Sequence, residues 1–245
     1  MVVKPADRTK IAVPVSEMRS LQLMVLDSGR GDSAQNMALD EALLEAMPRL
    51  RKPVLRFYGW TERAASFGYF QNYSEIEPLT LLRPLVRRPT GGGLVAHEAD
   101  WTYSLVLPTC HEWYAITATD SYVRVHEWIQ AAFAKLNVPT ELASCCHKSQ
   151  PGQCFSGHER FDLLWNGQKI AGAAQRRTRS GLLIQGSVQP PPLSLDRHQW
   201  QKGMCNAGSQ NGDQWQPFDR DPALLERARE LAGKKYSQAS YNRKR

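Results

Sequence analysis

The sequence has no apolar run near the roughly 18 residues that a membrane-spanning helix requires. Its first stretch, "MVVKPADRTKIAVPVSEMRS", is interrupted by charges and prolines where a signal peptide is apolar. No Pro/Gly/Ser-rich linker and no block of like charge divides the 245 residues. We therefore expect a cytoplasmic protein with no membrane segment and a single domain over 1–245, with a core at about 21–190 and a C-terminal helix and basic tail at 215–245.

Cysteines are few and odd in number, which argues against a complete disulfide framework. In the cytoplasm we expect all five to be thiols: Cys110, Cys145, Cys146, Cys154 and Cys205. A metal cluster is the weaker interpretation of Cys145, Cys146, His147 and Cys154. The usual Cys-x-x-Cys pair is missing, and adjacent cysteines rarely both bind one zinc ion. We predict no metal site.

Acidic residues are outnumbered, since 24 Asp and Glu face 31 Lys and Arg, for a formal net charge of +7. Such an excess favours acidic partners, either nucleic acid or an acidic carrier protein. The clusters Arg176-Arg177-Arg179 and "KKYSQASYNRKR" are not interleaved with an aromatic RNA-binding motif, and zinc-finger spacing is absent. A non-catalytic nucleic-acid binder therefore rests on charge alone, and we predict no nucleic-acid partner.

Hydrophobic residues make up 42% of the chain, enough for a core, and their periodicity predicts its elements. Strands are predicted at 21–29, 53–60, 64–70 and 100–108, the second and third joined at a turn near Trp60. A helix is predicted at 32–47, capped by Asp32 or Ser33, and another from a cap at Asp120 or Ser121.

Two hairpins and a last helix follow. Asn166-Gly167 separates two strand patterns and is a strong hairpin signal, because both residues accept a positive φ. A second hairpin is predicted to turn at 179–181. The last helix is predicted to begin after an Asp221 cap and to stop at Gly233. This order favours an α+β fold with a mixed, mostly antiparallel sheet backed by helices, not a Rossmann fold.

The stretch "RRPTGGGLVAH", residues 87–97, is the first candidate for chemistry. No Gly-Lys-Ser/Thr follows the glycines, and the next segment is a strand, so it is neither a Walker loop nor a dinucleotide fingerprint. Three glycines allow a ligand to lie directly against main-chain groups. Arg87 and Arg88 are suited to a carboxylate or phosphate. A plain flexible hairpin is the alternative.

"RRPTGGGLVAHEADWTYSL" resembles the core motif of the biotin/lipoate protein ligase and octanoyltransferase superfamily, and "NGQKIAGAAQRR" is similar to its lysine-containing segment. The resemblance runs from about Leu26 to Val188. It implies the fold shared by class II aminoacyl-tRNA synthetases and biotin ligases, with Lys169 as an active-site residue. It also implies an acyl pocket with the following substrate-binding residues: Arg87, Arg88, Thr90, Gly91, Gly92, Gly93, His97, Gly172 and Ala173.

"QCFSGHERF" resembles the Cys-Phe motif of the cysteine-type octanoyltransferases, which implies that Cys154 is the nucleophile. A thiolate is the natural acceptor in thioester exchange. A neighbouring ammonium, here from Lys169, lowers a thiol's pKa and can hydrogen-bond the developing oxyanion. A neutral lysine can also relay a proton. Ordinarily, however, such a cysteine is a buried hydrophobe, such a lysine an exposed charge and His97 a surface histidine.

The resemblance implies transfer of a medium-chain acyl group from a carrier thioester, through Cys154, to the lysine of a lipoyl domain. The expected donor is acyl carrier protein or an octanoylated H protein. The expected acceptors are lipoyl domains of the glycine cleavage H protein or of 2-oxoacid dehydrogenases. No cofactor is expected; ATP and Mg would be needed only by the alternative, a lipoate-protein ligase or, less favoured, a biotin ligase. We expect no accessory domain of the kind that many lipoate ligases carry, because the sequence ends soon after the catalytic region.

Two features complicate this assignment. Cys205, in "GMCNAG", is an alternative nucleophile, because another branch of octanoyltransferases carries its cysteine at about this place. Its surroundings lack that branch's Pro-Cys-Gly pattern. The superfamily also usually has a histidine before the Gly-Ser/Thr of the later strand, where this chain has Gln185. That departure places substrate choice in question.

Overall fold

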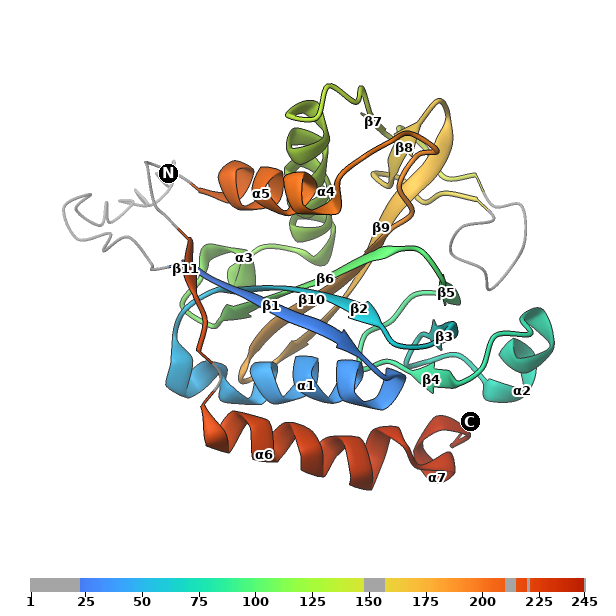
Figure 1. Cartoon of the computed structure of the whole chain (residues 1–245), viewed down its shortest axis with the longest axis vertical. Coiled ribbons are helices and arrows are strands. Elements are labelled where there is room, and N and C mark those ends of the chain that lie inside the picture. Colours follow the sequence, from blue (N-terminus) through green and yellow to red (C-terminus); the bar gives the residue numbers. More distant parts are fainter. Residues whose placement is uncertain (1–22, 148–156, 210–214, 220, 245) are drawn as a thin grey trace, which may run out of the picture.

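The computed structural model describes residues 23–147, 157–209, 215–219 and 221–244. Its main sheet has the order β11-β1-β2-β6-β10-β9-β8-β7, and a small sheet has the order β4-β3-β5 (Figure 1). The strands of the main sheet are β1 (Leu23–Gly31), β2 (Val54–Trp60), β6 (Trp101–Pro108), β7 (Glu141–Leu142), β8 (Leu163–Trp165), β9 (Gln168–Thr178), β10 (Gly181–Val188) and β11 (Trp215–Pro217). The small sheet contains β3 (Ala64–Phe67), β4 (Leu85–Arg87) and β5 (Val95–His97).

Helices cover both faces of the main sheet. On one face α1 lies against the sheet and α6 lies outside α1, whereas α4 and α5 pack together on the other face (Figure 1). The helices are α1 (Ser33–Leu50), α2 (Tyr73–Ile76), α3 (Glu112–Ala115), α4 (Ala118–Ala134), α5 (Arg197–Gly208), α6 (Pro222–Leu231) and α7 (Ala239–Asn242), with short helical turns η2 (Glu77–Leu79) and η3 (Ala232–Tyr236).

In the first unit, β1-α1-β2, the two strands pair in parallel, because the helix between them returns the chain to the same end of the sheet. Asp32 caps α1: its carboxylate accepts from the Gln35 N–H at 2.7 Å, and the Gln35 side chain accepts from the Asp32 N–H. From β2 onward the sheet is antiparallel through β6, β10, β9, β8 and β7. The predicted α+β fold with a mixed, mostly antiparallel sheet is confirmed.

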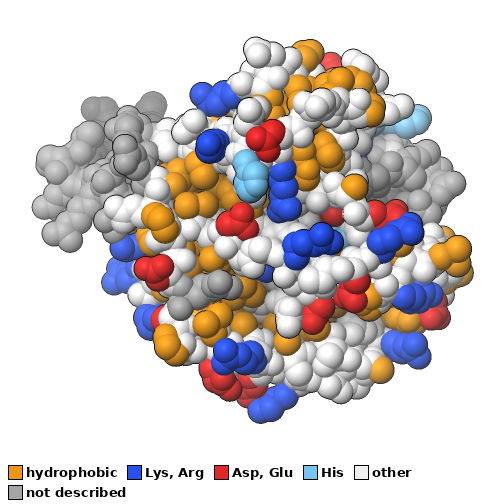
Figure 2. Space-filling view, in the orientation of Figure 1, with side chains coloured by type: hydrophobic (Ala, Val, Ile, Leu, Met, Phe, Trp, Pro, Cys, Tyr) orange, Lys and Arg blue, Asp and Glu red, His pale blue; other side chains and the backbone are white. Residues whose placement is uncertain are grey.

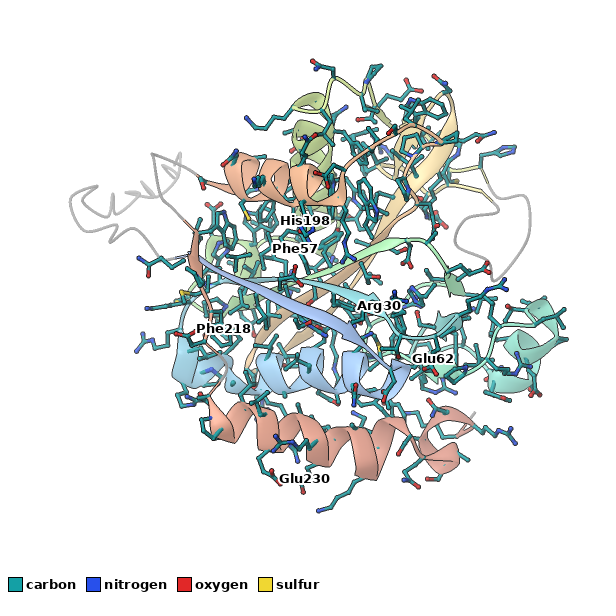
Figure 3. All side chains as sticks on the ribbon, viewed as in Figure 1. Arg30, Phe57, Glu62, His198, Phe218 and Glu230 are labelled. Carbon is teal, nitrogen blue, oxygen red and sulfur yellow. The ribbon has the colours of Figure 1, made fainter. Side chains whose placement is uncertain are left out.

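Residues of β6 contribute alternately to two apolar cores, one on each face of the sheet. Trp101, Tyr103, Leu105 and Leu107 face the core under α4 and α5, and Val106 faces the core under α1. On the neighbouring strand β2, Phe57 lies beneath α5 and meets the Trp200 ring edge-on at 5.6 Å (Figure 3). In the helix predicted after Asp120 or Ser121, the apolar residues Val125, Ile129 and Phe133 recur every four positions, and all three are fully buried in the same core.

Both predicted hairpins are present. Asn166 and Gly167 have φ angles of 48° and 74°, the positive values that a tight turn between β8 and β9 requires. Thr178 pairs with Gly181 across the second turn, which joins β9 to β10. Together they place a long two-stranded ribbon, β9-β10, in the centre of the molecule (Figure 1).

Other element predictions were wrong in detail. Helix α4 is capped by Thr117, whose hydroxyl accepts from the Asp120 N–H at 3.0 Å, so Asp120 lies in the first turn rather than at the cap. Gly233 does not stop the last helix, because the chain continues through it as η3. The strands at 54–60 and 64–67 follow one another but join different sheets, and α5 and β11 were not predicted.

Charged side chains of both signs share the face of the molecule drawn in Figure 2. Figure 2 shows Lys and Arg side chains interspersed with Asp and Glu over the face drawn, rather than gathered in one patch. At the edge of the small sheet Glu62 accepts from the Ser33 N–H and hydroxyl, both at 3.2 Å (Figure 3). Within the described ranges, no helix is long and apolar enough to cross a bilayer.

Candidate active site

A cavity lies between the small sheet and the β9-β10 ribbon, and the space between its lining residues, including the part open to solvent, is about 490 Å³. Its walls also include side chains from α1, β2 and β6. Residues far apart in the sequence therefore meet here. Six of the site residues expected from the sequence line it: Arg88, Gly92, His97, Lys169, Gly172 and Ala173.

The glycine-rich loop is folded down against the end of β3. The Tyr69 N–H donates to the Thr90 carbonyl at 2.8 Å, and Gly92 has a φ of 82°. A Cβ on Gly68 would lie 1.9 Å from the Gly92 carbonyl oxygen. The loop thus requires glycine at positions 68 and 92, and it forms a fixed wall of the cavity rather than a loose hairpin.

Arg88 is held by this loop. Its guanidinium donates to the Gly91 carbonyl at 2.6 Å and to the Gly93 carbonyl at 2.7 Å. It also donates to the Ser66 carbonyl at 3.1 Å and to the Ser66 hydroxyl at 3.3 Å. Arg88 is only 5% exposed, so its cation is fixed at the cavity wall.

Arg87 points elsewhere. Its side chain is buried and donates to the carbonyls of Tyr69, Gln71, Tyr241 and Asn242 at 2.7–3.3 Å. It does not line the cavity, in contrast to the pocket role expected from the sequence. The physical reason is that β4 lies against α7, so this side chain holds the C-terminal segment to the small sheet.

Thr90 connects the loop to the main sheet. Its hydroxyl donates to the Gln185 side-chain oxygen at 2.7 Å, and the Gln185 amide donates to Asp40 at 2.7 Å. Asp40 is fully buried and forms a 2.6 Å ion pair with Arg56, which is also buried. Gln185 therefore serves as both acceptor and donor at the position where a histidine was expected.

Lys169 presents an ammonium to the cavity from β9. It forms a 2.7 Å ion pair with Asp162, and its side chain is 6% exposed. Asp162 is also held by the Glu159 N–H at 2.7 Å and by the Tyr122 hydroxyl. Burial and the Asp162 charge raise the pKa of Tyr122 well above its usual value, so this hydroxyl remains a donor. A Cβ on Gly172 would lie 2.8 Å from the Lys169 Nζ.

His97 is part of a buried hydrogen-bonded chain in the opposite wall. Its Nδ1 lies 2.8 Å from an Asp100 carboxylate oxygen, and its Nε2 lies 2.8 Å from the Ser66 hydroxyl. The Trp60 ring stacks on the imidazole with centroids 3.8 Å apart. Ser66 and His97 both line the cavity. His97 is thus a fixed residue of the site and not a surface histidine.

The expected nucleophile, Cys154, lies outside the described residues. His147 and His158, on either side of it in the sequence, pair through two backbone hydrogen bonds of 2.8 Å. The alternative, Cys205, is half-buried on α5 and is not part of the cavity lining, and burial raises its pKa to about 11. Its thiolate is disfavoured at neutral pH. In the part of the chain that the structure describes, no three His, Cys, Asp or Glu residues are grouped to hold a metal ion.

Four residues of the site were not anticipated: Ser66, Asp100, Tyr122 and Asp162. Asp100 follows His97 by three positions, which was a usable local signal. Tyr122 and Asp162 are 40 positions apart, and only packing of α4 against β8 and β9 brings them together. No local pattern indicates such a contact.

Comparison with known proteins shows the family of the chain. The model of the lipoyl protein ligase A/B catalytic domain matches residues 32–189. Octanoyltransferase LipM of Exiguobacterium sibiricum is 36% identical over 187 residues, covering 70% of this chain and 66% of that protein. Octanoyltransferase LipM of Carboxydothermus hydrogenoformans is 38% identical over 163 residues, covering 63% and 60%. The chain thus spans slightly less than two thirds of these curated relatives.

Among solved structures, lipoate-protein ligase A bound with ATP superposes with a TM-score of 0.70 at 20% sequence identity, covering 91% of this chain and 98% of that one. At this identity the likeness concerns the fold. It agrees with the mixed sheet and helical layers described above.

Proposed function

Because the chain belongs to the lipoyl protein ligase A/B catalytic domain family, we propose that it is an octanoyltransferase for protein lipoylation. It moves a medium-chain acyl group from a carrier-protein thioester, through a cysteine acyl-enzyme, to the lysine of a lipoyl domain. The observation that carries this proposal is the buried Lys169 ammonium, fixed by Asp162 and facing a cavity walled by the glycine-rich loop. The relatives named octanoyltransferases support the reaction class.

We assign the nucleophile to Cys154. Its thiolate attacks the thioester carbonyl, a new C–S bond forms, and the carrier thiolate leaves. The neutral lipoyl-domain amine then attacks the enzyme thioester, the C–S bond breaks, and the proton lost by the amine passes to the Cys154 sulfur as the amide forms. Both steps pass through a tetrahedral oxyanion, which a preorganised ammonium stabilises. Lys169 is suited to this task, because its pairing with Asp162 holds the cation in place without solvent.

The donors we propose are acyl carrier protein or an octanoylated H protein, and the acceptors are lipoyl domains of H protein or of 2-oxoacid dehydrogenases. The excess of positive charge suits acidic carrier proteins, because complementary charge accelerates encounter. No cofactor takes part in this reaction. The cavity wall formed by Gly92, His97 and Ala173 is where we place the acyl chain.

Intact-mass spectrometry tests the nucleophile. After incubation with octanoylated acyl carrier protein, the wild type and a Cys110→Ala control are expected to carry one octanoyl adduct, since Cys110 is exposed and outside the cavity. Cys154→Ala is expected to carry none. An adduct that persists in Cys154→Ala and disappears in Cys205→Ala would move the assignment to Cys205.

The same proteins can be used to distinguish a transferase from a ligase. A transferase modifies a lipoyl domain from the carrier thioester without nucleotide. A ligase modifies it from free lipoate only with ATP and Mg. Modification that requires ATP, together with no adduct on any cysteine, would reject the transferase assignment.

A further inference from the structure

We propose that Ser66, His97 and Asp100 form a second acyl-accepting site, which gives the protein hydrolytic activity toward medium-chain esters and thioesters. This activity is additional to the transfer reaction. Only the preferred acyl chain rests on the proposed function. The three residues come from β3, from the end of β5 and from the turn before β6, and both Ser66 and His97 line the cavity.

The proton positions follow from the contacts. Asp100 as a carboxylate only accepts, so the His97 Nδ1, 2.8 Å away, carries the proton. In its neutral form the ring then has an acceptor at Nε2, to which the Ser66 hydroxyl, 2.8 Å away, can donate. A serine that donates to a histidine oriented by an aspartate is the arrangement in which histidine acts as general base for the serine.

The three side chains are buried and held in place by their neighbours. Ser66, His97 and Asp100 are 2%, 4% and 7% exposed. The Trp60 ring lies flat on the imidazole, at an interplanar angle of 16°. The acceptor oxygen of Asp100 also receives the Ser187 hydroxyl at 2.7 Å. Packing and hydrogen bonds of this kind preorganise a nucleophile before substrate arrives.

Two cations favour charge development at this site. The Arg88 guanidinium donates to the Ser66 hydroxyl at 3.3 Å, so it stabilises negative charge on that oxygen as the proton leaves. The Lys169 ammonium lines the same cavity, where it can stabilise the oxyanion of a bound acyl group.

The reaction balances with water as the co-reactant. The Ser66 oxygen bonds to the acyl carbon while its proton passes to the His97 Nε2. The C–S or C–O bond of the substrate then breaks, and the imidazolium protonates the leaving thiolate or alkoxide. A water molecule gives its proton to His97 as it attacks the acyl-serine. Ser66 leaves with that proton, and the carboxylic acid is released.

The test uses the full chain with Cys154→Ala, so that acyl transfer to that thiol is absent. Hydrolysis of p-nitrophenyl octanoate by this variant is expected to exceed the buffer rate. Adding Ser66→Ala is expected to return the rate to that of buffer, and adding Asp100→Asn is expected to remove most of the rate above buffer, because the imidazole loses the carboxylate that orients it. Adding Ser237→Ala, an exposed serine, serves as the control.

A labelling measurement avoids dependence on the folding of the serine variant. An octyl fluorophosphonate is expected to modify Cys154→Ala once, on the peptide that contains Ser66. No hydrolysis above buffer by Cys154→Ala, equal hydrolysis with and without Ser66, or labelling of a different serine would each overturn the proposal. Failure of the transfer proposal shows separately, as the absence of a thioester adduct on the wild type.

Discussion

At the scale of single residues, Gly172 leaves the space that the Lys169 ammonium occupies. An added Cβ would meet both Cε and Nζ of Lys169 at 2.8 Å. Gly172→Ala is therefore expected to slow octanoyl-adduct formation at least about tenfold, as displacement by about 1 Å of a catalytic group can cost up to 10². The far end of a lysine moves easily, so the melting temperature should change little.

Gly233→Ala provides the matched control for this substitution, because an added Cβ there meets nothing within 4 Å. Both rates are measured by intact mass in a quenched time course. Equal rates for Gly172→Ala and Gly233→Ala would show that the position of the ammonium does not limit acylation.

The buried ion pair of Lys169 and Asp162 predicts a non-additive pair of variants. Removing one partner takes the opposite charge away from a buried ion, so Asp162→Asn and Lys169→Met are each expected to lower the free energy of unfolding by about 3–5 kcal/mol. The double variant buries no lone charge and should lose clearly less than the sum of both. Urea unfolding of the four proteins measures the coupling. Strict additivity would mean that the pair does not act as a unit.

Whether the sequence indicates a site residue depends on how far apart along the chain the residue and its contacts lie. Lys169, His97 and Gly92 stand in motifs that resemble a known family, and all three line the cavity. Asp162 and Tyr122 make the site as much as Lys169 does, but their partners are brought close only by tertiary packing. Arg87 stands beside Arg88 in the motif, yet Arg87 ends β4 and Arg88 follows it, and the two side chains have different surroundings.

At the scale of elements, helix α4 connects the core to the site through His126. This side chain is completely buried, its Nδ1 donates to the Tyr122 carbonyl at 2.8 Å, and the charges facing it include Asp162 and Lys169. Burial, the largest cause, lowers its pKa from 6.5 to about 4. The folded protein therefore binds this proton less readily than the unfolded chain does.

This lowered pKa makes the stability of the folded protein depend on pH. Between pH 6.5 and 4 the unfolded chain takes up a proton that the folded state excludes, so stability falls as the pH falls. The loss attributable to His126 approaches about 3 kcal/mol at the lower limit. This loss of stability is absent above pH 7. Urea unfolding from pH 4.5 to 7.5 should give a shallower slope for His126→Gln than for the wild type. Identical slopes would assign the acid sensitivity to other groups.

Local patterns predicted elements well where the signal is local. The Asn166-Gly167 turn, the Asp32 cap and the apolar stripe of α4 each depend on a few neighbouring residues, and each is present. Sheet membership is not local. The strands β2 and β3 are separated by three residues but pair with different partners, because β3 is drawn between β4 and β5. The cavity exists because of this separation into two sheets.

At the scale of the whole molecule, the C-terminal segment of the chain is bound to the small sheet and to α1 from outside the site. The C-terminal helices α6 and α7 follow α1 and end beside the small sheet (Figure 1). Lys235 and Tyr236 donate to Glu41 of α1, at distances of 2.5–2.8 Å. The Arg87 side chain of β4, which donates to the Tyr241 and Asn242 carbonyls, binds the same segment to the small sheet. The C-terminal segment thus supports the wall that carries the glycine-rich loop.

Arg87→Met is the variant that tests this arrangement. It removes hydrogen bonds to the Tyr69, Gln71 and Asn242 carbonyls, and bonds to a charged group contribute about 1.5–3 kcal/mol each. We expect the free energy of unfolding to fall by about 3 kcal/mol or more. Proteolytic cleavage near Asn242 should also become faster, because α7 loses its anchor.

Arg63→Met is the control for loss of an arginine. Its side chain is 75% exposed and pairs with Glu98 at the surface, where such pairs contribute at most about 1 kcal/mol. Stability by urea unfolding and limited proteolysis followed by mass spectrometry are compared for the two variants. If Arg87→Met also slows octanoyl-adduct formation, then the anchor acts on the cavity through β4 and the loop. A variant with unchanged stability and unchanged cleavage would show that α7 stays in place without Arg87.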